Sequence, residues 1–464
     1  MLFPTYVFLF AFLPVTLLVY WLIPASTLRL AALTLASCVF YAYWDWRYLS
    51  VMLVSTTADW IAGEVIVRSE RAGIRRLALA AAIAVNLGLL FYFKYVHFFF
   101  GQLNGVAHLL GGGEPLPALR VVLPIGISFF TFNAMSYAID LYRGTVQPAK
   151  NIVHYLAFVS MFPHLIAGPI VRYADVDQQL RRLVPRLTAG LAGSGLYFFT
   201  MGMVKKLLIA DILAPHVDAL WRQAPHLGLL NGWAAALGYS LQLYFDFSGY
   251  SDMAVGLAFL LGFRFPQNFD SPYKAVNISQ FWRRWHMTLA FWFRDYVFIP
   301  LGGSREGLLI TFRNLLVVWF LVGLWHGAAW TFVIWGLLHG TYLVVHSVCR
   351  RAGLTPSWTW LNRLITFVAV VVAWVFFRAP DVRVAGDVLR AMVGAGAGGF
   401  AAGPRLAPQF VALLIGGLAW VNLAPNTWEV SLEPKPRYAL ALGLLLGSAI
   451  LTIAAPSPFL YFQF

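Results

Sequence analysis

Two of the ten histidines lie in sequence contexts that suit acid–base chemistry. His326 interrupts an apolar stretch that runs from Leu315 to Leu338, so its imidazole lies far from either end of that stretch. A membrane tolerates the uncharged form of histidine, and an ordinary pKa of about 6.5 suits the ring to accept a proton from a hydroxyl group at neutral pH. General base is therefore one interpretation of His326. The other is a packed histidine that is hydrogen-bonded to a neighbouring helix.

The second histidine, His286, follows Arg283, Arg284 and Trp285 in a segment rich in tryptophan. One interpretation is an interfacial helix whose tryptophans lie at headgroup depth and whose arginines bind lipid phosphate. The other is that the arginines contact the phosphate of a bound cofactor. The interfacial interpretation is favoured for the two arginines, but it accounts less well for the histidine.

The carboxylates and the remaining histidines give weaker signals. Asp252 follows a Phe-Ser-Gly-Tyr-Ser sequence and predicts either a helix cap, which is favoured, or a partner that orients a histidine. His339 and His346 are seven residues apart and share a helix face, which is more often packing than a metal site.

Several chemistries are excluded by their missing motifs. The sequence has no His-Glu-x-x-His zinc motif, no Walker phosphate-binding loop and no Gly-x-Ser-x-Gly nucleophile elbow. We therefore expect no metal and no cofactor. Its two cysteines, Cys38 and Cys349, lie in apolar segments where burial explains them.

The composition indicates which elements must position these residues. Of 464 residues, 60% are hydrophobic and 11% are charged. Soluble chains have roughly half and roughly a quarter, respectively. The net charge of +14 comes from short basic clusters between apolar runs, which positive-inside topology explains better than binding to nucleic acid. The chain is therefore predicted to be an all-helical, multi-pass membrane protein.

Apolar runs of the length that crosses a bilayer can be located directly, because a spanning helix needs about 20 mostly apolar residues. Twelve candidates are residues 4–23, 28–46, 48–67, 77–100, 121–142, 189–213, 232–262, 308–326, 328–348, 362–377, 408–424 and 438–455. Residues 152–171 are apolar but contain two prolines and a glycine, so we predict a broken or re-entrant helix that must be buried or line a cavity. Residues 264–307 carry the weakest hydrophobic signal. We expect one membrane domain over residues 1–464.

Ordered motifs along nearly the whole chain carry a family resemblance. They are Leu123–Phe132, Met161–Ile170, Tyr244–Ala254, Gly262-Phe263, Asn268-Phe269, Phe281–His286, Arg294–Tyr296, Pro300–Gly303, Gly323–Gly327 and Tyr461–Phe464. The sequence resembles the membrane-bound O-acyltransferases, specifically the bacterial branch of the alginate O-acetyltransferase membrane subunit. This resemblance implies a ring of about 11–13 tilted helices, with broken segments, around a central tunnel.

The resemblance also implies roles for individual residues. The histidine of the Trp-His-Gly motif, His326, is expected to be catalytic, and His286 maps to the second catalytic position of the family. Contacts to the donor or substrate are expected from six further residues, namely Arg283, Arg284, Trp285, Trp325, Asp252 and Ser128.

The implied reaction is O-acyl transfer in the bacterial inner membrane. The expected donor is acetyl-CoA or another cytoplasmic acyl thioester, and the expected acceptor is an extracytoplasmic polysaccharide such as alginate, reached through a partner protein. Membrane lipid is a further expected partner, and nucleic acid is not.

Three alternatives remain open at this stage. One is transfer of D-alanyl or another acyl group to a cell-wall polymer. The second is a transporter, which would need broken helices in corresponding halves and paired ionisable groups. The third is a scaffold for a polysaccharide complex, which would tolerate the loss of both histidines.

Overall fold

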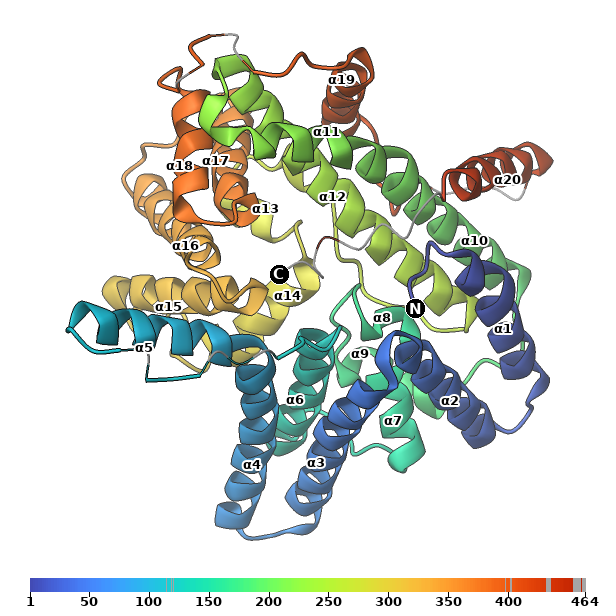
Figure 1. The fold of residues 1–464 in the computed structure, drawn as a ribbon. Coiled ribbons are helices and arrows are strands. Elements are labelled where there is room, and N and C mark those ends of the chain that lie inside the picture. The colour runs from blue at the N-terminus through green and yellow to red at the C-terminus, as the bar shows by residue number, and fades with distance from the viewer. Residues whose placement is uncertain are drawn as a thin grey trace. The chain divides into compact units, whose positions relative to one another are not determined.

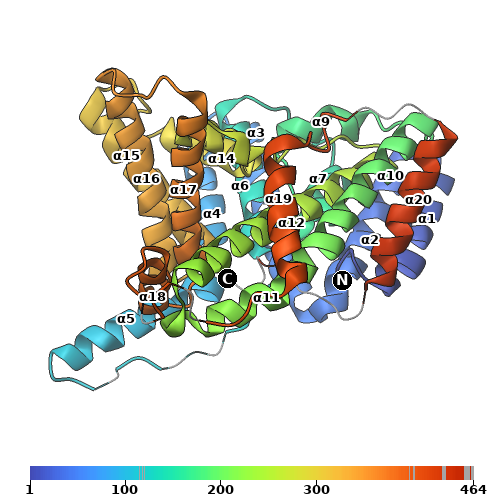
Figure 2. The ribbon, with the colours of Figure 1, turned by 90° about the horizontal axis from the view of Figure 1, so that it is seen from above.

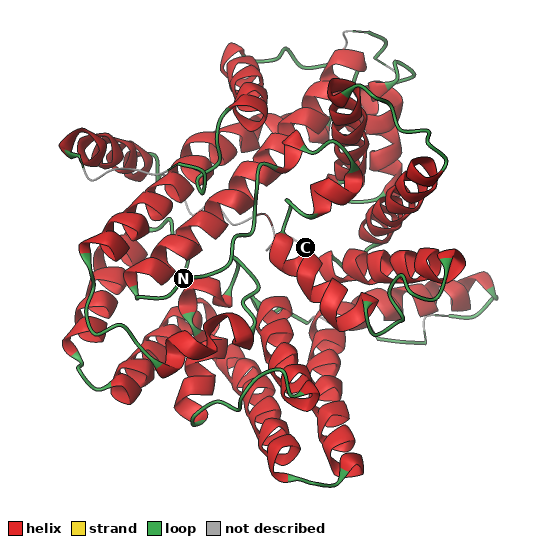
Figure 3. Ribbon diagram, turned by 180° about the vertical axis from the view of Figure 1, so that it is seen from behind, coloured by secondary structure: helices red, strands yellow, loops and turns green. Residues whose placement is uncertain are grey.

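The computed structural model describes residues 1–113, 115–117, 119, 121–396, 398–400, 403–430, 435–453 and 460. In this part of the chain every regular element is a helix, and no strand occurs (Figure 3). The expected all-helical class is therefore confirmed. The Tyr461–Phe464 motif lies outside the described residues.

The chain forms two compact units. Two of the three boundaries between them fall within helices, α10 (Ala189–Met203) and α12 (Leu229–Leu260), and the third lies after Pro266. Unit 1 comprises Met1–Phe199 and Ala254–Pro266, and unit 2 comprises Thr200–Met253 and Gln267–Phe464. The single membrane domain expected over the whole chain stays a prediction, as do the ring and the tunnel.

Unit 1 is built on antiparallel helices that pack through small side chains. Helices α3 and α4 lie against each other, and α6 packs on both (Figure 1). Ala62, Ala82 and Ala138 are buried where these three helices meet, so the backbones approach closely. The α-helices of unit 1 that precede α10 are α1 (Leu13–Leu22), α2 (Ser26–Asp45), α3 (Leu49–Arg68), α4 (Ala72–Leu90), α5 (Val96–Leu109), α6 (Ile127–Arg143), α7 (Ile152–Ser160), α8 (Phe162–Leu165) and α9 (Tyr173–Arg181).

The predicted break in residues 152–171 is confirmed. Helix α7 ends at Ser160, Met161 leaves the helical region with ψ 112°, and α8 is a single turn that begins at Phe162. Pro163 stands at the start of α8, where a missing N–H is tolerated. The segment is largely buried inside unit 1, which satisfies the condition for irregular backbone in a membrane protein.

Unit 2 contains a helical hairpin, and the Trp-His-Gly motif lies at the connection between its two helices. Helices α15 and α16 run side by side, and α17 packs on α16 (Figure 2). A Cβ atom on Gly336 of α16 would meet the carbonyl oxygen of Trp319 on α15, so only glycine permits this approach. The helices of unit 2 after α12 are α13 (Ile278–Trp282), α14 (Met287–Phe293), α15 (Leu308–His326), α16 (Trp330–Arg351), α17 (Thr359–Arg378), α18 (Val382–Met392), α19 (Pro408–Leu423) and α20 (Pro436–Leu451), and α11 (Asp211–Arg222) precedes α12.

Among the described residues, five helical segments are long and apolar enough to cross a membrane. They are Ser26–Arg68, Ala72–Leu109, Leu308–His326, Trp330–Arg351 and Thr359–Arg378. Three shorter apolar helices, Phe8–Leu22, Pro408–Leu423 and Pro436–Leu451, match further expected spans. The chain is therefore a multi-pass membrane protein.

The expected spans 28–46 and 48–67 correspond to α2 and α3, which a short turn at Trp46–Tyr48 joins within the stretch Ser26–Arg68. The twelve expected spans differ from this set in one way. Residues 121–142, 189–213 and 232–262 are mainly helical, but they do not meet the criteria of length and hydropathy for a span. Helices α6 and α12 carry buried polar side chains, such as Asp140 and Asp246, which lower the hydropathy of these helices.

Candidate active site

His326 is the last residue of α15 and lies within an aromatic cluster. Its side chain is buried, at 4% exposure, and its ring meets Trp335 of α16 edge-on with 4.9 Å between centroids. Phe377 of α17 contacts it from another side at 5.2 Å. Gly327 then takes an extended conformation, and α16 begins at Trp330, so a short connection holds the imidazole between three helices.

His286 is held in an unusual backbone conformation. It precedes α14 with φ 43° and ψ 52°, the left-handed region, which costs roughly 1–2 kcal/mol for a residue with a Cβ atom. Strain of this kind persists only where the surroundings enforce it, and it concentrates at functional sites. The side chain is fully buried and meets Phe247 of α12 edge-on at 4.7 Å.

The structure brings the two predicted catalytic histidines together through one tryptophan. The Trp325 ring lies 4.9 Å from the His326 ring and 6.0 Å from the His286 ring, between centroids. Burial lowers the pKa of His286 to about 3, so the neutral imidazole is the form present at neutral pH. The two buried imidazoles lie beside apolar rings, which keep water away from them.

Asn268 connects His286 to two neighbouring segments. Its Oδ1 lies 3.1 Å from His286 Nδ1 and accepts a hydrogen bond from Thr288 Oγ1 at 2.9 Å. Its Nδ2 donates to Ser251 Oγ of α12 at 3.1 Å, and its carbonyl oxygen accepts from Met287 N at 3.0 Å. One asparagine thus holds both the backbone and the side chain at this histidine.

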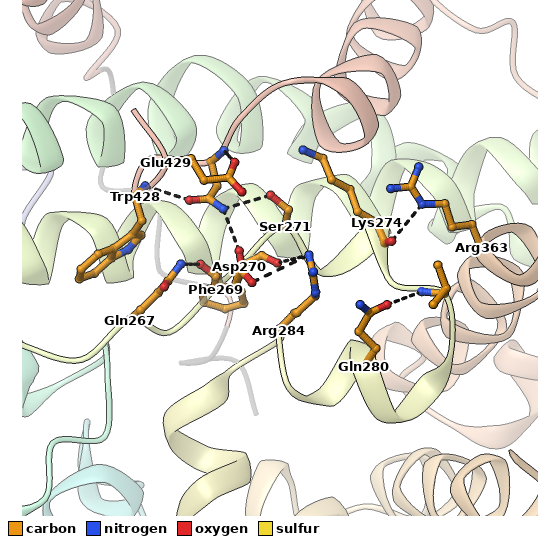
Figure 4. A network of polar contacts seen from close by, with 12 residues as sticks. Gln267, Phe269, Asp270, Ser271, Lys274, Gln280, Arg284, Arg363, Trp428 and Glu429 are labelled. Carbon is orange, nitrogen blue, oxygen red and sulfur yellow. Dashed lines mark hydrogen bonds and ion pairs between the residues drawn. The ribbon is translucent and has the colours of Figure 1, made fainter. Parts of the chain in front are cut away.

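A polar network fixes the segment that carries Asn268 (Figure 4). Asp270 N donates to Arg284 O at 2.9 Å, and Arg284 Nη1 donates to Asp270 O at 3.3 Å. Asn426 Nδ2, from the loop after α19, donates to Asp270 Oδ1 at 3.0 Å and to Ser271 Oγ at 3.2 Å. Ser271 also has a left-handed φ of 44°, so strained backbone occurs on both paired segments.

The interfacial interpretation of the Trp-rich segment is wrong for its tryptophans. Trp282 and Trp285 are buried inside the protein, at 6% and 1% exposure, and do not face headgroups. Trp285 stacks on Phe281 and contacts Trp374 of α17 at 4.8 Å. Because α13 packs against α16, these aromatic rings find protein partners in place of lipid.

The two arginines have different surroundings. Arg284 is engaged with Asp270 in the network described above, which indicates a structural role. Arg283 is exposed and lines a cavity of about 650 Å³ between α13, α16 and α17. Arg350 and His346 of α16 line the same cavity, and none of its described lining residues is acidic. Such a cavity suits an anionic group.

The predicted helix cap at Asp252 is wrong. Helix α12 continues to Leu260, so Asp252 is interior, and its Oδ2 accepts hydrogen bonds from Lys205 Nζ and from Thr427 Oγ1, both at 2.6 Å. Ser128 belongs to unit 1, where it is the second residue of α6 and accepts a hydrogen bond from Lys94 Nζ at 3.5 Å. Contacts of these two residues with a donor stay predictions.

The described residues contain no group of three or more His, Cys, Asp or Glu side chains that could hold a metal ion. His339, one half of the weak metal signal, is buried, and its Nδ1 accepts a hydrogen bond from Trp282 Nε1 at 3.2 Å. Its surroundings are those of a packed core histidine.

Sequence reasoning missed two residues that the structure places at important positions. Asn268 was recognised only as part of a family motif, and Lys205 was not predicted to have a role. A lysine within the apolar run 189–213 was a usable signal, because a charge in such a run requires a partner. Asn268 gave no comparable local signal.

Comparison with known proteins identifies the class. The model of the membrane-bound O-acyltransferase family matches residues 127–383, which include both histidines. The chain belongs to this family and is an O-acyltransferase. It is 43% identical to a protein of Azotobacter vinelandii named probable alginate O-acetylase AlgI, over 84% of this chain and 78% of the relative.

Two further relatives act on other polymers, as their names state. The peptidoglycan O-acetyltransferase of Helicobacter pylori is 39% identical over 85% of this chain and 80% of the relative. The teichoic acid D-alanyltransferase of Bacillus subtilis is 28% identical over 56% of this chain and 68% of the relative. These relatives share acyl transfer to a polymer and differ in the polymer and the acyl group.

Proposed function

We propose that this protein passes an acetyl group from a cytoplasmic thioester, acetyl-CoA in the simplest case, across the bacterial inner membrane for O-acetylation of an extracytoplasmic polysaccharide such as alginate. A partner protein outside the membrane completes the transfer. The observation that carries this proposal is the pair of buried histidines, His286 and His326, which contact one tryptophan, Trp325. The names of the relatives support acetyl as the acyl group and a polymer as the final acceptor.

In the proposed reaction His326 acts as general base. It takes the proton of the attacking hydroxyl group, whose oxygen forms a bond to the thioester carbonyl carbon. The carbon–sulfur bond then breaks, and the thiol leaves with the proton that His326 returns. A thioester is already activated, so the enzyme needs mainly positioning, a base and the exclusion of water. Trp335 and Phe377 supply the apolar walls around His326.

Arg283 is the arginine that we assign to the phosphates of the donor. It lines the 650 Å³ cavity together with Arg350, whereas Arg284 is held by Asp270. A guanidinium group matches phosphate with paired hydrogen bonds, and a cavity without described acidic lining residues does not oppose it. The cavity also has apolar walls, which suit the uncharged part of an acyl donor.

A second candidate is transfer of D-alanyl to a cell-wall polymer, because a teichoic acid D-alanyltransferase is among the relatives. The histidine chemistry would be the same, since that donor is also an activated acyl group. The identity to this relative is 28%, against 43% and 39% for the two acetyl-transfer relatives, which favours acetyl.

Acetyl transfer by the purified protein in liposomes tests the proposal. Labelled acetyl-CoA is supplied with candidate polysaccharide and extracytoplasmic partner protein, and wild type is compared with His326→Ala and His286→Ala. His226→Ala, which removes an exposed histidine of unit 2, is the matched control. We expect label in the acceptor, or histidine-dependent hydrolysis, for wild type and His226→Ala only.

Full activity of His326→Ala would overturn the base assignment. Transfer from a D-alanyl carrier protein, with none from acetyl-CoA, would establish the second candidate instead. A protein that supports polysaccharide export normally without either histidine would favour a transporter or scaffold.

A further inference from the structure

We infer that Asn268 is a positioning residue that fixes the proton of His286 on Nδ1, so that Nε2 presents a lone pair to the substrate. This inference rests on the proposed function and deepens it, because it decides which kind of contact His286 can make. A ring nitrogen with a lone pair accepts a proton or a hydrogen bond. Such a nitrogen carries no hydrogen, so it cannot donate a hydrogen bond to an oxyanion.

The orientation of the Asn268 amide follows from its neighbours. The backbone N–H of Thr288 points at Oδ1 from 3.4 Å, and Thr288 Oγ1 donates to the same oxygen at 2.9 Å. A reversed amide would set its NH₂ group against that backbone N–H, and two donors repel each other. Ser251 Oγ accepts from Nδ2 at 3.1 Å, which agrees with the same orientation. Oδ1 therefore faces His286.

The tautomer of His286 follows from this orientation. Oδ1 carries no hydrogen and can only accept, and it lies 3.1 Å from His286 Nδ1. A hydrogen bond at this distance requires a proton on Nδ1. A neutral ring has one N–H, so Nε2 is the acceptor. The burial of His286, which is 0% exposed, disfavours the doubly protonated ring.

The ring is also fixed in direction. Phe247 meets it edge-on at 4.7 Å with an interplanar angle of 88°, while Met287 N is bound to the Asn268 carbonyl oxygen at 3.0 Å. The left-handed backbone of His286 needs such restraints, because φ 43° is unfavourable for this residue. Asn268 thus acts on the imidazole through one group and on its backbone through another. It acts through His286, and we assign it no contact with substrate.

A spectroscopic experiment tests the tautomer independently of activity. Solid-state NMR of the ¹⁵N-histidine-labelled full chain in lipid bilayers resolves the ring nitrogens, and His286→Ala identifies the signals of His286. We expect a neutral ring protonated on Nδ1 in wild type, and a shift of the proton to Nε2, or a mixture, in Asn268→Ala. Protonation of Nε2 in wild type would overturn the inference even if acetyl transfer is demonstrated.

The activity of an Asn268 variant tests the link to function. Asn268→Ala should lower acetyl transfer per folded protein at least tenfold. The matched control is Asn314→Ala in α15, which removes a fully buried asparagine bonded to the Leu301 and Gly303 carbonyl oxygens. We expect this control to lose stability but to keep its turnover.

The outcomes separate the two proposals. Wild-type turnover in Asn268→Ala, with His286→Ala inactive, would refute the positioning role and leave the proposed function standing. If no donor gives histidine-dependent transfer, the proposed function fails, and the NMR result alone decides whether Asn268 sets the tautomer.

Discussion

The buried ion pair between Lys205 and Asp252 offers the sharpest test of how unit 2 is held together. The side chains are 6% and 7% exposed, Lys205 Nζ lies 2.6 Å from Asp252 Oδ2, and Thr427 Oγ1 contacts both charged groups. Asp252→Ala would leave the Lys205 ammonium group buried beside a single hydroxyl. Removing one partner of a buried pair costs about 3–5 kcal/mol, because the remaining charge loses its compensation.

The magnitude can be resolved into steps with two further variants. Thr427→Val removes the hydroxyl that bonds to both charged groups but leaves the two ions paired with each other, so it should cost about 1.5–3 kcal/mol. Replacing both ions, as in Lys205→Met with Asp252→Leu, removes the desolvation penalty together with the attraction, so most of the loss should be recovered. We therefore expect the order of stability to be wild type, double variant, Thr427→Val, Asp252→Ala, with the first two close together.

Thermal unfolding of the detergent-solubilised protein, followed by tryptophan fluorescence, measures this order. Asp387→Ala is the control, because it breaks an ion pair with the exposed Arg390 and should barely change the midpoint. A double variant as unstable as Asp252→Ala would refute the argument, since it would show that packing volume and not an uncompensated charge determines the loss. An unchanged midpoint for Asp252→Ala would refute it as well.

Three further predictions concern the active site and its supports. Arg283→Gln should raise the KM for acetyl-CoA at least severalfold and leave the KM for acetyl-pantetheine, which lacks phosphate, unchanged; an equal rise for both donors would contradict the phosphate role. Gly336→Ala should lower the midpoint of thermal unfolding, because the added Cβ meets the Trp319 carbonyl oxygen. The control is Gly386→Ala in α18, whose added Cβ meets nothing within 4 Å and should stabilise the protein by about 0.5–1 kcal/mol. His286→Gly and His286→Ala should both be inactive, but the glycine variant should be the more stable by about 1 kcal/mol, because glycine adopts φ 43° without strain. Equal stability of these two variants would show that the backbone relaxes once the ring is removed.

Local features of the sequence were sufficient for several predictions. The helical class, the ends of most long apolar helices and the break near Pro163 follow from hydropathy and from the backbone limits of proline. These features are readable because each depends on residues within a few turns of one another.

The failed predictions depend on contacts between distant residues. Asp252 was expected to cap a helix, but its cation is 47 positions away in the chain. Trp282 and Trp285 were expected at headgroup depth, but α16 and α17 bury them. Hydropathy reports that a side chain avoids water and does not tell whether lipid or protein surrounds it.

By itself, the sequence determined that this protein is a helical membrane protein of the O-acyltransferase family with two histidines in unusual surroundings. Only the tertiary structure decided that Asn268 holds His286, that Arg283 faces a cavity while Arg284 binds Asp270, and that Lys205 neutralises Asp252. The reason is physical: hydropathy and helical period act along the chain, whereas the partner of a buried polar group is chosen by the packing of helices that meet only after folding.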